Sequence, residues 1–414
     1  MITQGKRQPA ASQKPATFAV MNKSMVGLLL MVILCDMGER MAERFLPIYL
    51  IALGGGAISI GLLNGLDNLL SALYSYPGGV LSDRLGTKKA LIVFNCIAIF
   101  GFTIVAIVPR WEAVLFGAIF FISWSAISLP ATMGLIYRIF PKDRRTMGVT
   151  MHSLVRRVPM ALGPVLGGVF IAMWGERTGI RLAFCCAIAM ALAAMVMQQA
   201  LIEPDPQRKK TARGSSIGAS ALWRMMGHDL RSLLVADILV RFCEQIPYAF
   251  VVVWCMKTIP HPVSAPAFGI LTTIEMATAV VIYIPVAYFA DRAKKKPFVV
   301  ATFVFFTLFP LALLYSRSFP WLAAAFVLRG LKEFGEPTRK ALIMDLVPEE
   351  HKAGAFGLYY LLRDMIVSVA AFGGALLWEI SPTVNLLTAL AFGAAGTLWF
   401  ALRGHDLNTA GAGR

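Results

Sequence analysis

The chain contains 414 residues, of which 57% are hydrophobic and 15% are charged, and its formal net charge at pH 7 is +16. Soluble globular proteins carry about 25% charged residues and about 45–50% apolar ones. The composition therefore excludes a soluble enzyme, a disulfide-stapled secreted domain and a disordered chain. It predicts an all-α polytopic membrane protein.

Apolar stretches of membrane-spanning length follow one another along most of the chain. A helix needs about 20 apolar residues to cross a hydrocarbon core of about 30 Å. We predict twelve transmembrane helices in two groups of six, at residues 25–50, 59–82, 90–109, 113–138, 147–174, 180–201, 232–257, 266–290, 297–316, 320–345, 354–379 and 384–403. A stretch rich in Pro, Gly, Ser, Lys and Arg separates the groups and is typical of a linker. The predicted domains are an N-terminal tail (1–24), a first bundle (25–201), a linker (202–231), a second bundle (232–403) and a C-terminal tail (404–414).

Basic residues indicate the orientation of the predicted helices. They gather in the breaks on the side of the two chain ends, whereas the opposite loops hold only Arg110, Arg177, Arg181, Lys257 and Arg317. By the positive-inside rule, both termini are expected in the cytoplasm. The positive charge is thus explained by orientation, and no nucleic acid partner is expected. We predict a multi-pass protein of a cell membrane, the inner (cytoplasmic) membrane of a bacterium.

The two predicted bundles share a pattern of charged and small residues. Three charged positions of the first helix recur at an offset of 201 residues, so that Asp36, Arg40 and Glu43 match Asp237, Arg241 and Glu244. At offsets of 206 to 208, Asp67 matches Glu275, Pro130 matches Pro337, and Gly167 and Gly168 match Gly373 and Gly374. Such a series indicates a duplicated six-helix unit and two pseudo-symmetric bundles. Parallel repeats place a substrate cavity at their interface near the bilayer midplane.

The loop after the second predicted helix combines glycine, acidic and basic residues in a characteristic order. These residues are Gly79, Asp83, Arg84, Gly86, Lys88 and Lys89, and a partial copy in the second half keeps Asp291 and Arg292. Gly86 permits a tight turn, and the aspartate can pair with an arginine or a helix N-terminus. The pattern resembles the motif between helices two and three of the major facilitator superfamily. The resemblance implies a twelve-helix fold, secondary transport rather than catalysis, and a loop that latches the cytoplasmic side in the outward-open state.

The fifth predicted helix contains closely spaced small residues and a proline, namely Gly163, Pro164, Gly167 and Gly168. The segment resembles the antiporter motif of drug-exporting members of the superfamily, although Pro159 replaces an earlier glycine of that motif. Two interpretations remain open. The resemblance implies export by antiport, whereas small residues and proline also simply let membrane helices pack closely and bend. The arginine that is typical of the fourth helix in proton-driven drug exporters is absent from residues 120–128.

Charged residues inside the predicted helices carry the main functional signal, because a charge at the centre of a membrane helix costs about 2.5–3.5 kcal/mol on insertion scales. The first helix places four of them on one face by their i, i+3, i+4 and i+7 spacing. Such residues form structural ion pairs between helices or line a polar cavity that couples transport to protons. We favour the second interpretation for the set, and the expected proton-coupling residues are Asp36, Glu39, Glu43, Asp67, Glu275 and Glu333.

Further residues are expected to contact the substrate. The charged candidates are Arg40, Arg241, Arg329, Lys332, Asp237 and Glu244, and the candidate stacking surfaces are Trp124, Tyr248 and Tyr359. Four more charges are expected near the midplane, namely Arg156, Arg157, Arg363 and Asp364. The mixture of acids and bases favours a polar solute with at least one charge, either anionic or zwitterionic.

We therefore predict a proton-coupled secondary active transporter, not an enzyme, that moves a small polar or charged organic solute across the lipid bilayer by alternating access. Export by antiport is favoured over uptake by symport, and a monomer is expected. The chain has no phosphate-binding loop and no Cys/His cluster with metal-ligand spacing, so neither a cofactor nor a bound metal is expected. The alternatives are symport of an anionic or zwitterionic solute, a divalent-metal exporter, a lipid mover, or a receptor without flux.

Overall fold

A computed structural model describes residues 23–122, 145–202, 226–290, 295–346 and 352–404, together with Trp124, Ser128, Thr132, Met133 and Leu135. The described residues form helices and connecting turns, with no strand among them. The helices of the first half are α1 (Lys23–Glu43), α2 (Leu46–Ala52), α3 (Ala57–Leu85), α4 (Thr87–Ile107), α5 (Trp111–Phe121) and α7 (Arg145–Leu201). Those of the second half are α9 (His228–Gln245), α10 (Val251–Val253), α11 (Ala265–Ala290), α12 (Lys295–Tyr315), α13 (Phe319–Leu331), α14 (Glu336–Asp345), α15 (Lys352–Ile380) and α16 (Pro382–Arg403).

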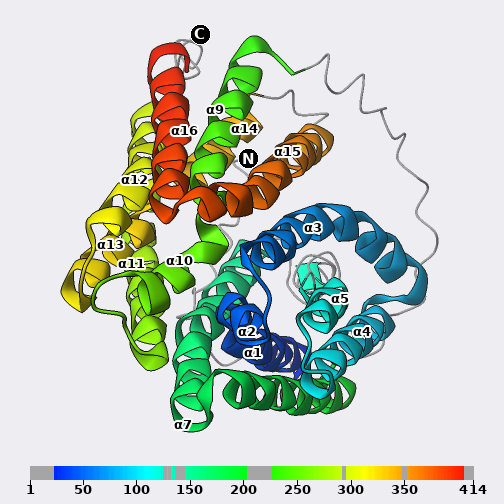
Figure 1. The fold of residues 1–414 in the computed structure, drawn as a ribbon. Coiled ribbons are helices and arrows are strands. Elements are labelled where there is room, and N and C mark those ends of the chain that lie inside the picture. The colour runs from blue at the N-terminus through cyan, green and yellow to red at the C-terminus, as the bar shows by residue number, and fades with distance from the viewer. Residues whose placement is uncertain are drawn as a thin grey trace, which may run out of the picture.

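The observed helices follow the predicted transmembrane segments within a few residues wherever both ends are described. Seven of the described segments are long and apolar enough to cross a membrane by length and composition. The predicted fifth and sixth helices are joined as α7, without the short loop expected between them. The chain turns there at Gly175, whose φ of 78° lies in the left-handed region that glycine adopts without steric cost. Figure 1 shows the two arms of α7 on either side of this bend.

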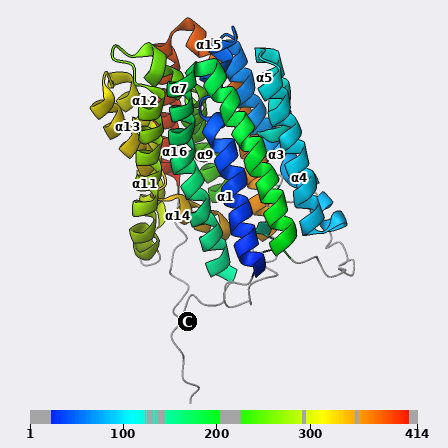
Figure 2. The same cartoon turned by 90° about the horizontal axis from the view of Figure 1, so that it is seen from below.

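The helices on either side of residues 203–225 gather into two groups that lie side by side (Figure 1). In the first half, α1 packs against α7, and α4 packs against α5 and α7. In the second half, α9 and α12 pack against α16. The most extensive contacts between the halves are those of α7 with α11 and of α3 with α15. This arrangement matches the two predicted bundles, and Figure 2 shows the long helices running roughly parallel through the molecule.

The halves touch closely at the end of the molecule opposite to Lys23 and Arg403, called here the far end. A methyl group added at Gly61 of α3 would lie 2.3 Å from the Cβ atom of Ala375 in α15. One added at Gly168 of α7 would lie 2.5 Å from the carbonyl oxygen of Ala265 in α11. These contacts show that glycine lets the helices of the two halves approach each other, as small residues do in membrane proteins.

Candidate solute-binding site

Three helices are interrupted at the interface between the halves. Turns interrupt the regular helix between α1 and α2 at Arg44 and Phe45, after α9 at Ile246 and Pro247, and between α13 and α14 at residues 332–335. Prolines at positions 47, 247 and 337 lie at or just after these breaks, where a missing backbone N–H interrupts the helix. Irregular backbone inside a membrane is tolerated where it is covered by protein or lines a cavity. The breaks therefore indicate where a site can form.

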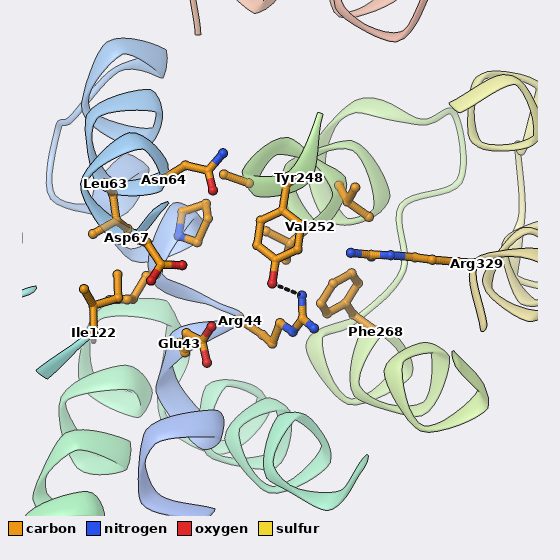
Figure 3. Close-up of a pocket in the computed structure, with 14 residues that line it drawn as sticks. Glu43, Arg44, Leu63, Asn64, Asp67, Ile122, Tyr248, Val252, Phe268 and Arg329 are labelled. Carbon is orange, nitrogen blue, oxygen red and sulfur yellow. Dashed lines mark hydrogen bonds between the residues drawn. The ribbon is translucent and has the colours of Figure 1, made fainter. Parts of the chain in front are cut away.

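A cavity of about 510 Å³, including its open part, lies among these breaks. Figure 3 shows its labelled side chains converging from both halves. Its charged residues are Glu43, Arg44, Asp67 and Arg329, and Tyr248 and Asn64 add polar atoms. The remaining lining residues are Leu46, Pro47, Leu63, Ile122, Ala249, Val251, Val252 and Phe268. A mostly apolar wall with a few polar groups is typical of sites for small organic molecules.

The basic side chains of the cavity meet at one aromatic ring. The Nη1 atom of Arg44 donates a hydrogen bond to the hydroxyl oxygen of Tyr248 over 3.0 Å. The guanidinium carbon of Arg329 lies 5.6 Å from the centre of the same ring and also approaches the rings of Phe309 and Phe326. Arg329 is further paired with Glu275, with 3.3 Å between Nε and Oε1. The cavity thus has a cationic side that is held in place by aromatic contacts.

The acidic side chains lie on the opposite side of Tyr248 (Figure 3). Glu43 is neutralised within its own helix, because its Oε2 atom lies 2.5 Å from Nη1 of Arg40. Asp67 is half-buried and accepts a hydrogen bond from the hydroxyl of Ser71 over 3.4 Å. Among the residues that the structure describes, no ion pair to Asp67 occurs. Its carboxylate therefore faces the cavity without a basic partner.

A smaller cavity of about 290 Å³ adjoins the first at Arg329 and Val251. It is lined by Glu244 and Lys332 and by the rings of Phe305, Phe306 and Phe309. Lys332 bridges two acids, with its Nζ atom 2.8 Å from Glu244 and 3.4 Å from Glu275. Four of the expected substrate contacts thus line cavities, namely Arg329, Lys332, Glu244 and Tyr248. Glu275 lines neither cavity and pairs with Arg329 and Lys332.

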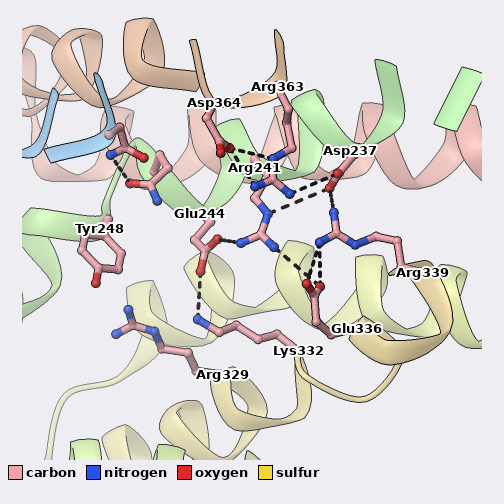
Figure 4. A network of polar contacts seen from close by, with 12 residues as sticks. Asp237, Arg241, Glu244, Tyr248, Arg329, Lys332, Glu336, Arg339, Arg363 and Asp364 are labelled. Atoms are coloured by element: carbon pink, nitrogen blue, oxygen red, sulfur yellow. Dashed lines mark hydrogen bonds and ion pairs between the residues drawn. The ribbon is translucent and has the colours of Figure 1, made fainter. Parts of the chain in front are cut away.

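Asp237 lines neither cavity and forms the centre of a buried polar network that extends through Arg241 to Glu244 at the smaller cavity (Figure 4). It is paired with Arg339 of α14, receives a hydrogen bond from the Tyr359 hydroxyl over 3.1 Å, and lies 3.4 Å from Arg363. Arg363 also pairs with Asp364 over 2.7 Å. Asp237 and Tyr359 line neither cavity, and their polar atoms bind each other and neighbouring arginines, so their contact with substrate stays a prediction. Arg241, also expected to contact substrate, instead joins Glu244 and Glu336 at 2.6 and 3.6 Å.

The first half holds two further ion pairs that involve α7. Asp36 is fully buried in α1 and its Oδ2 atom lies 2.9 Å from Nε of Arg156. Glu39 is also buried, and its Oε2 atom has no hydrogen-bond partner in the described part of the chain. Arg157 reaches across to the second half, where its Nη2 atom lies 3.1 Å from Oε2 of Glu333. The charged stripe therefore faces other helices, as its spacing predicts, but Asp36 and Glu333 are engaged in ion pairs.

Trp124 does not supply a stacking surface in either cavity. Its indole N–H donates to Oδ1 of Asn95 over 2.8 Å, and the side chain is 5% exposed. Its polar atom is thus satisfied inside the first half, and a contact of Trp124 with substrate stays a prediction.

The loop motif after α3 is described in part. Gly86 connects α3 to α4 with a φ of 82°, which confirms the predicted tight turn. Lys88 donates to the carbonyl oxygens of Ile202 and Gln199 at 2.6 and 3.0 Å, so it caps the end of α7 within its own half. Arg84 and Lys89 are exposed. Asp291 and Arg292 lie outside the described residues, as do the surroundings of Gly79 and the side chain of Asp83, and the latch stays a prediction.

The small residues of the fifth predicted helix lie where α7 contacts other helices. A methyl group at Gly163 would lie 2.6 Å from Cβ of Arg40, and one at Gly167 would lie 1.9 Å from the carbonyl oxygen of Met41. Across the halves, Pro164 contributes a carbonyl oxygen that a methyl group at Gly269 of α11 would approach to 2.6 Å. These contacts give the motif a packing role.

Several site residues were not predicted. Arg44 provides a cation to the main cavity, and Arg339 binds Asp237. Asn64 and Asn68 donate to the backbone oxygen and Oε1 of Gln245 in the other half, over 3.1 and 3.2 Å. The prolines that follow Arg44 and Gln245 were the available signal, because they mark the helix breaks that expose these residues.

Two bundles of membrane-spanning helices with a charged cavity between them define a polytopic membrane transporter. The family model for the Major Facilitator Superfamily matches residues 28–259 and again residues 233–412. The chain belongs to this superfamily. It is a multi-pass membrane protein of the secondary transporter type rather than an enzyme, and the two matches agree with the predicted duplication.

Two relatives extend the comparison at the level of sequence. An uncharacterized MFS-type transporter of Methanocaldococcus jannaschii is 22% identical over 370 residues, which cover 85% of this chain and 87% of that protein. The quinolone resistance protein NorA of Staphylococcus aureus is 28% identical over 196 residues, which cover 46% of this chain and 48% of NorA. The similarity to NorA thus spans about half of each protein.

Solved transporter structures share the fold. A crystal structure of the nucleoside transporter NupG has a TM-score of 0.76 and 16% identity, with 91% of this chain and 99% of NupG covered. A peptide transporter POT in complex with sulfate has a TM-score of 0.73 and 14% identity, with 94% of each chain covered. At such identities the likeness concerns the fold alone.

Proposed function

We propose that the protein is a proton-coupled antiporter that exports a small charged organic solute, with Asp67 as the site where the proton and the solute alternate. The observation that carries this proposal is the position of Asp67. Its carboxylate lines the cavity, is half-buried, and has no ion pair in the described chain. A carboxylate in such a place is stabilised either by a proton or by a cationic group of a solute, and the two exclude each other.

The other acids serve this role less well. Asp36 binds Arg156, Glu43 binds Arg40, and Glu275 lies near both Arg329 and Lys332. Each would have to release a cation before it could exchange a proton. Glu39 has no ion pair in the described residues but is 5% exposed and lines neither cavity, so we assign it to a proton path at most.

The direction and orientation follow from two further features. Partial similarity to NorA, which is named for quinolone resistance, supports export. The excess of basic residues near the chain ends supports a cytoplasmic position for both termini in a bacterial inner membrane. The far end would then face outward, and its close contacts, including the Lys257–Glu176 ion pair at 2.5 Å, would belong to an inward-facing state. Transport by a monomer is part of the proposal.

Proteoliposomes with an imposed pH gradient test the proposal. Amino acids, dipeptides, organic amines and organic carboxylates are added in turn, and collapse of the gradient is followed with a pH-sensitive dye. We expect at least one compound to collapse the gradient with the wild-type protein and none to do so with Asp67→Asn. Solute binding should also weaken as the pH falls, because a proton on Asp67 removes the negative charge that the solute needs.

The matched control is Asp364→Asn, which removes a carboxylate that pairs with Arg363 outside both cavities. It should collapse the gradient like the wild type. If Asp67→Asn exchanges protons at the wild-type rate while its unfolding midpoint is unchanged, Asp67 is not the coupling site. If no compound moves protons with the wild type, the coupling itself is refuted.

A further inference from the structure

Two opposite charges without counter-ions share the main cavity. Asp67 in α3 has no ion pair in the part of the chain that the structure describes, and within the same ranges Arg44 has none either. Arg44 instead donates to the Tyr248 hydroxyl and lies with its guanidinium carbon 5.3 Å from the centre of that ring. Both side chains are half-buried and line one cavity, and no ion pair joins them to each other.

Figure 3 shows how these charges are separated. Asp67 and Glu43 lie on one side of the Tyr248 ring, and Arg44 and Arg329 lie on the other. Tyr248 stands between these groups, and apolar lining residues lie at both ends, with Leu63 beside Asp67 and Phe268 beside Arg44. The cavity therefore has an acidic end and a basic end, each with apolar lining.

Singly charged solutes match only half of this arrangement. A partly buried charge without a partner is costly in a low-dielectric site. An organic cation at Asp67 leaves Arg44 without a partner, and an organic anion at Arg44 leaves Asp67 without one. A solute that carries both charges compensates both side chains at once, and its apolar part can pack against Phe268 and Leu63.

We infer that the solute is an amphipathic zwitterion whose amine binds at Asp67 and whose anionic group binds at Arg44, with Arg329 beside it. This inference rests on the proposed function, since it names the solute class of the same cavity. It also predicts which contact of the solute a proton weakens. A proton on Asp67 removes the partner of the amine alone, while the contact of the anionic group at Arg44 persists.

Ligand-dependent thermal unfolding of the detergent-solubilised full chain tests the inference, because a ligand that binds the folded state raises the midpoint. The probes are L-phenylalanine and the dipeptide L-phenylalanyl-L-alanine, which differ in the separation of their two charges. Each is compared with its N-acetyl form, which lacks the cation, and with its C-terminal amide, which lacks the anion. We expect at least one zwitterion to bind about tenfold or more tightly than both of its singly charged forms.

Two variants should separate the two ends of the site. With Arg44→Gln, the zwitterion should lose its advantage over the amide but keep its advantage over the N-acetyl form. With Asp67→Asn, the opposite should hold. Arg110→Gln, at an exposed arginine outside both cavities, should bind all probes like the wild type.

The inference is overturned if neither zwitterion binds more tightly than its amide and its N-acetyl form, or if Arg44→Gln affects all forms equally. In that case the proposed function still stands if another compound collapses the pH gradient through Asp67. Conversely, a zwitterion that binds in the predicted way but moves no protons would support the solute class and refute the coupling.

Discussion

The two halves of the molecule carry matching carboxylates in unlike surroundings. Glu275 is 1% exposed, and one of its oxygens lies 3.3 and 3.4 Å from Arg329 and Lys332. Asp67, its counterpart in the repeat, is half-buried and bonded to Ser71. The offset that aligns Pro130 with Pro337 places Ile122 opposite Arg329, so the first half has no cation at that position. Glu275 thus holds two cations in a buried network, whereas Asp67 has no ion pair among the described residues.

The largest expected effect tests this comparison through stability. Glu275→Gln removes the carboxylate between two buried cations, and breaking a buried pair from one side costs about 3–5 kcal/mol. Asp67→Asn breaks no ion pair among the described residues and should leave the unfolding free energy within about 0.5 kcal/mol of the wild type. Chemical unfolding of both variants in the same detergent measures the difference. Equal losses of unfolding free energy in the two variants would show that Glu275 and Asp67 do not differ in their contribution to stability.

The fold could be predicted almost completely from the sequence. Apolar stretches, the charge bias of the loops and the repeat gave the helices, because lipid imposes their length and leaves few other structures open. The turn between the arms of α7 was predicted as a short loop because residues 175–179 have loop composition, although a single glycine in the left-handed region suffices to turn the chain. Local sequence does not reveal how few residues a connection needs.

The site was predicted less completely, because partners depend on the distance between helices. The i, i+4 spacing of Asp36 and Arg40 permits a pair within one helix, yet Asp36 binds Arg156 and Arg40 binds Glu43. Arg44 lies at the break after α1, and its side chain reaches Tyr248 of the other half. Sequence spacing identified the charged helix faces and could not identify which face meets which.

Glycines of the repeat offer a second comparison, with an intermediate expected effect. A Cβ atom at Gly167 would lie 1.9 Å from the Met41 carbonyl oxygen, a backbone atom that cannot move aside easily. Its counterpart Gly373 has no atom within 4 Å of the corresponding position among the atoms that the structure describes. Gly167→Ala should therefore destabilise the protein by about 1–3 kcal/mol through overpacking. Gly373→Ala is the matched control and should be neutral or slightly stabilising, because alanine favours the helix.

Thermal unfolding of the two alanine variants side by side measures this contrast. Similar midpoints would mean that α1 and α7 adjust freely at their contact. The close approach at Gly167 would then not account for the glycine at that position.

The smallest expected effect concerns the ion pair that joins the halves near the cavity. Arg157 and Glu333 are 25% and 23% exposed in their side chains and lie 3.1 Å apart. A pair with such exposure contributes about 0.2–1 kcal/mol, so Arg157→Gln or Glu333→Gln should raise the population of molecules with a separated far end by at most about fivefold. Spin labels at Thr178→Cys and His261→Cys, placed in a cysteine-free background, report this population as a change in distance.

The double variant decides whether the two residues act together. If the pair holds the halves in contact, Arg157→Gln with Glu333→Gln should shift the population no further than either change alone. The exposed pair Arg110 and Glu112, 3.2 Å apart within one half, provides the control and should leave the distance unchanged when both are replaced by glutamine. Additive shifts from Arg157→Gln and Glu333→Gln would mean that each acts through other neighbours. A coupled shift would also imply that a proton on Glu333 weakens the contact between the halves. Glutamine has nearly the shape of the protonated acid and therefore mimics this state.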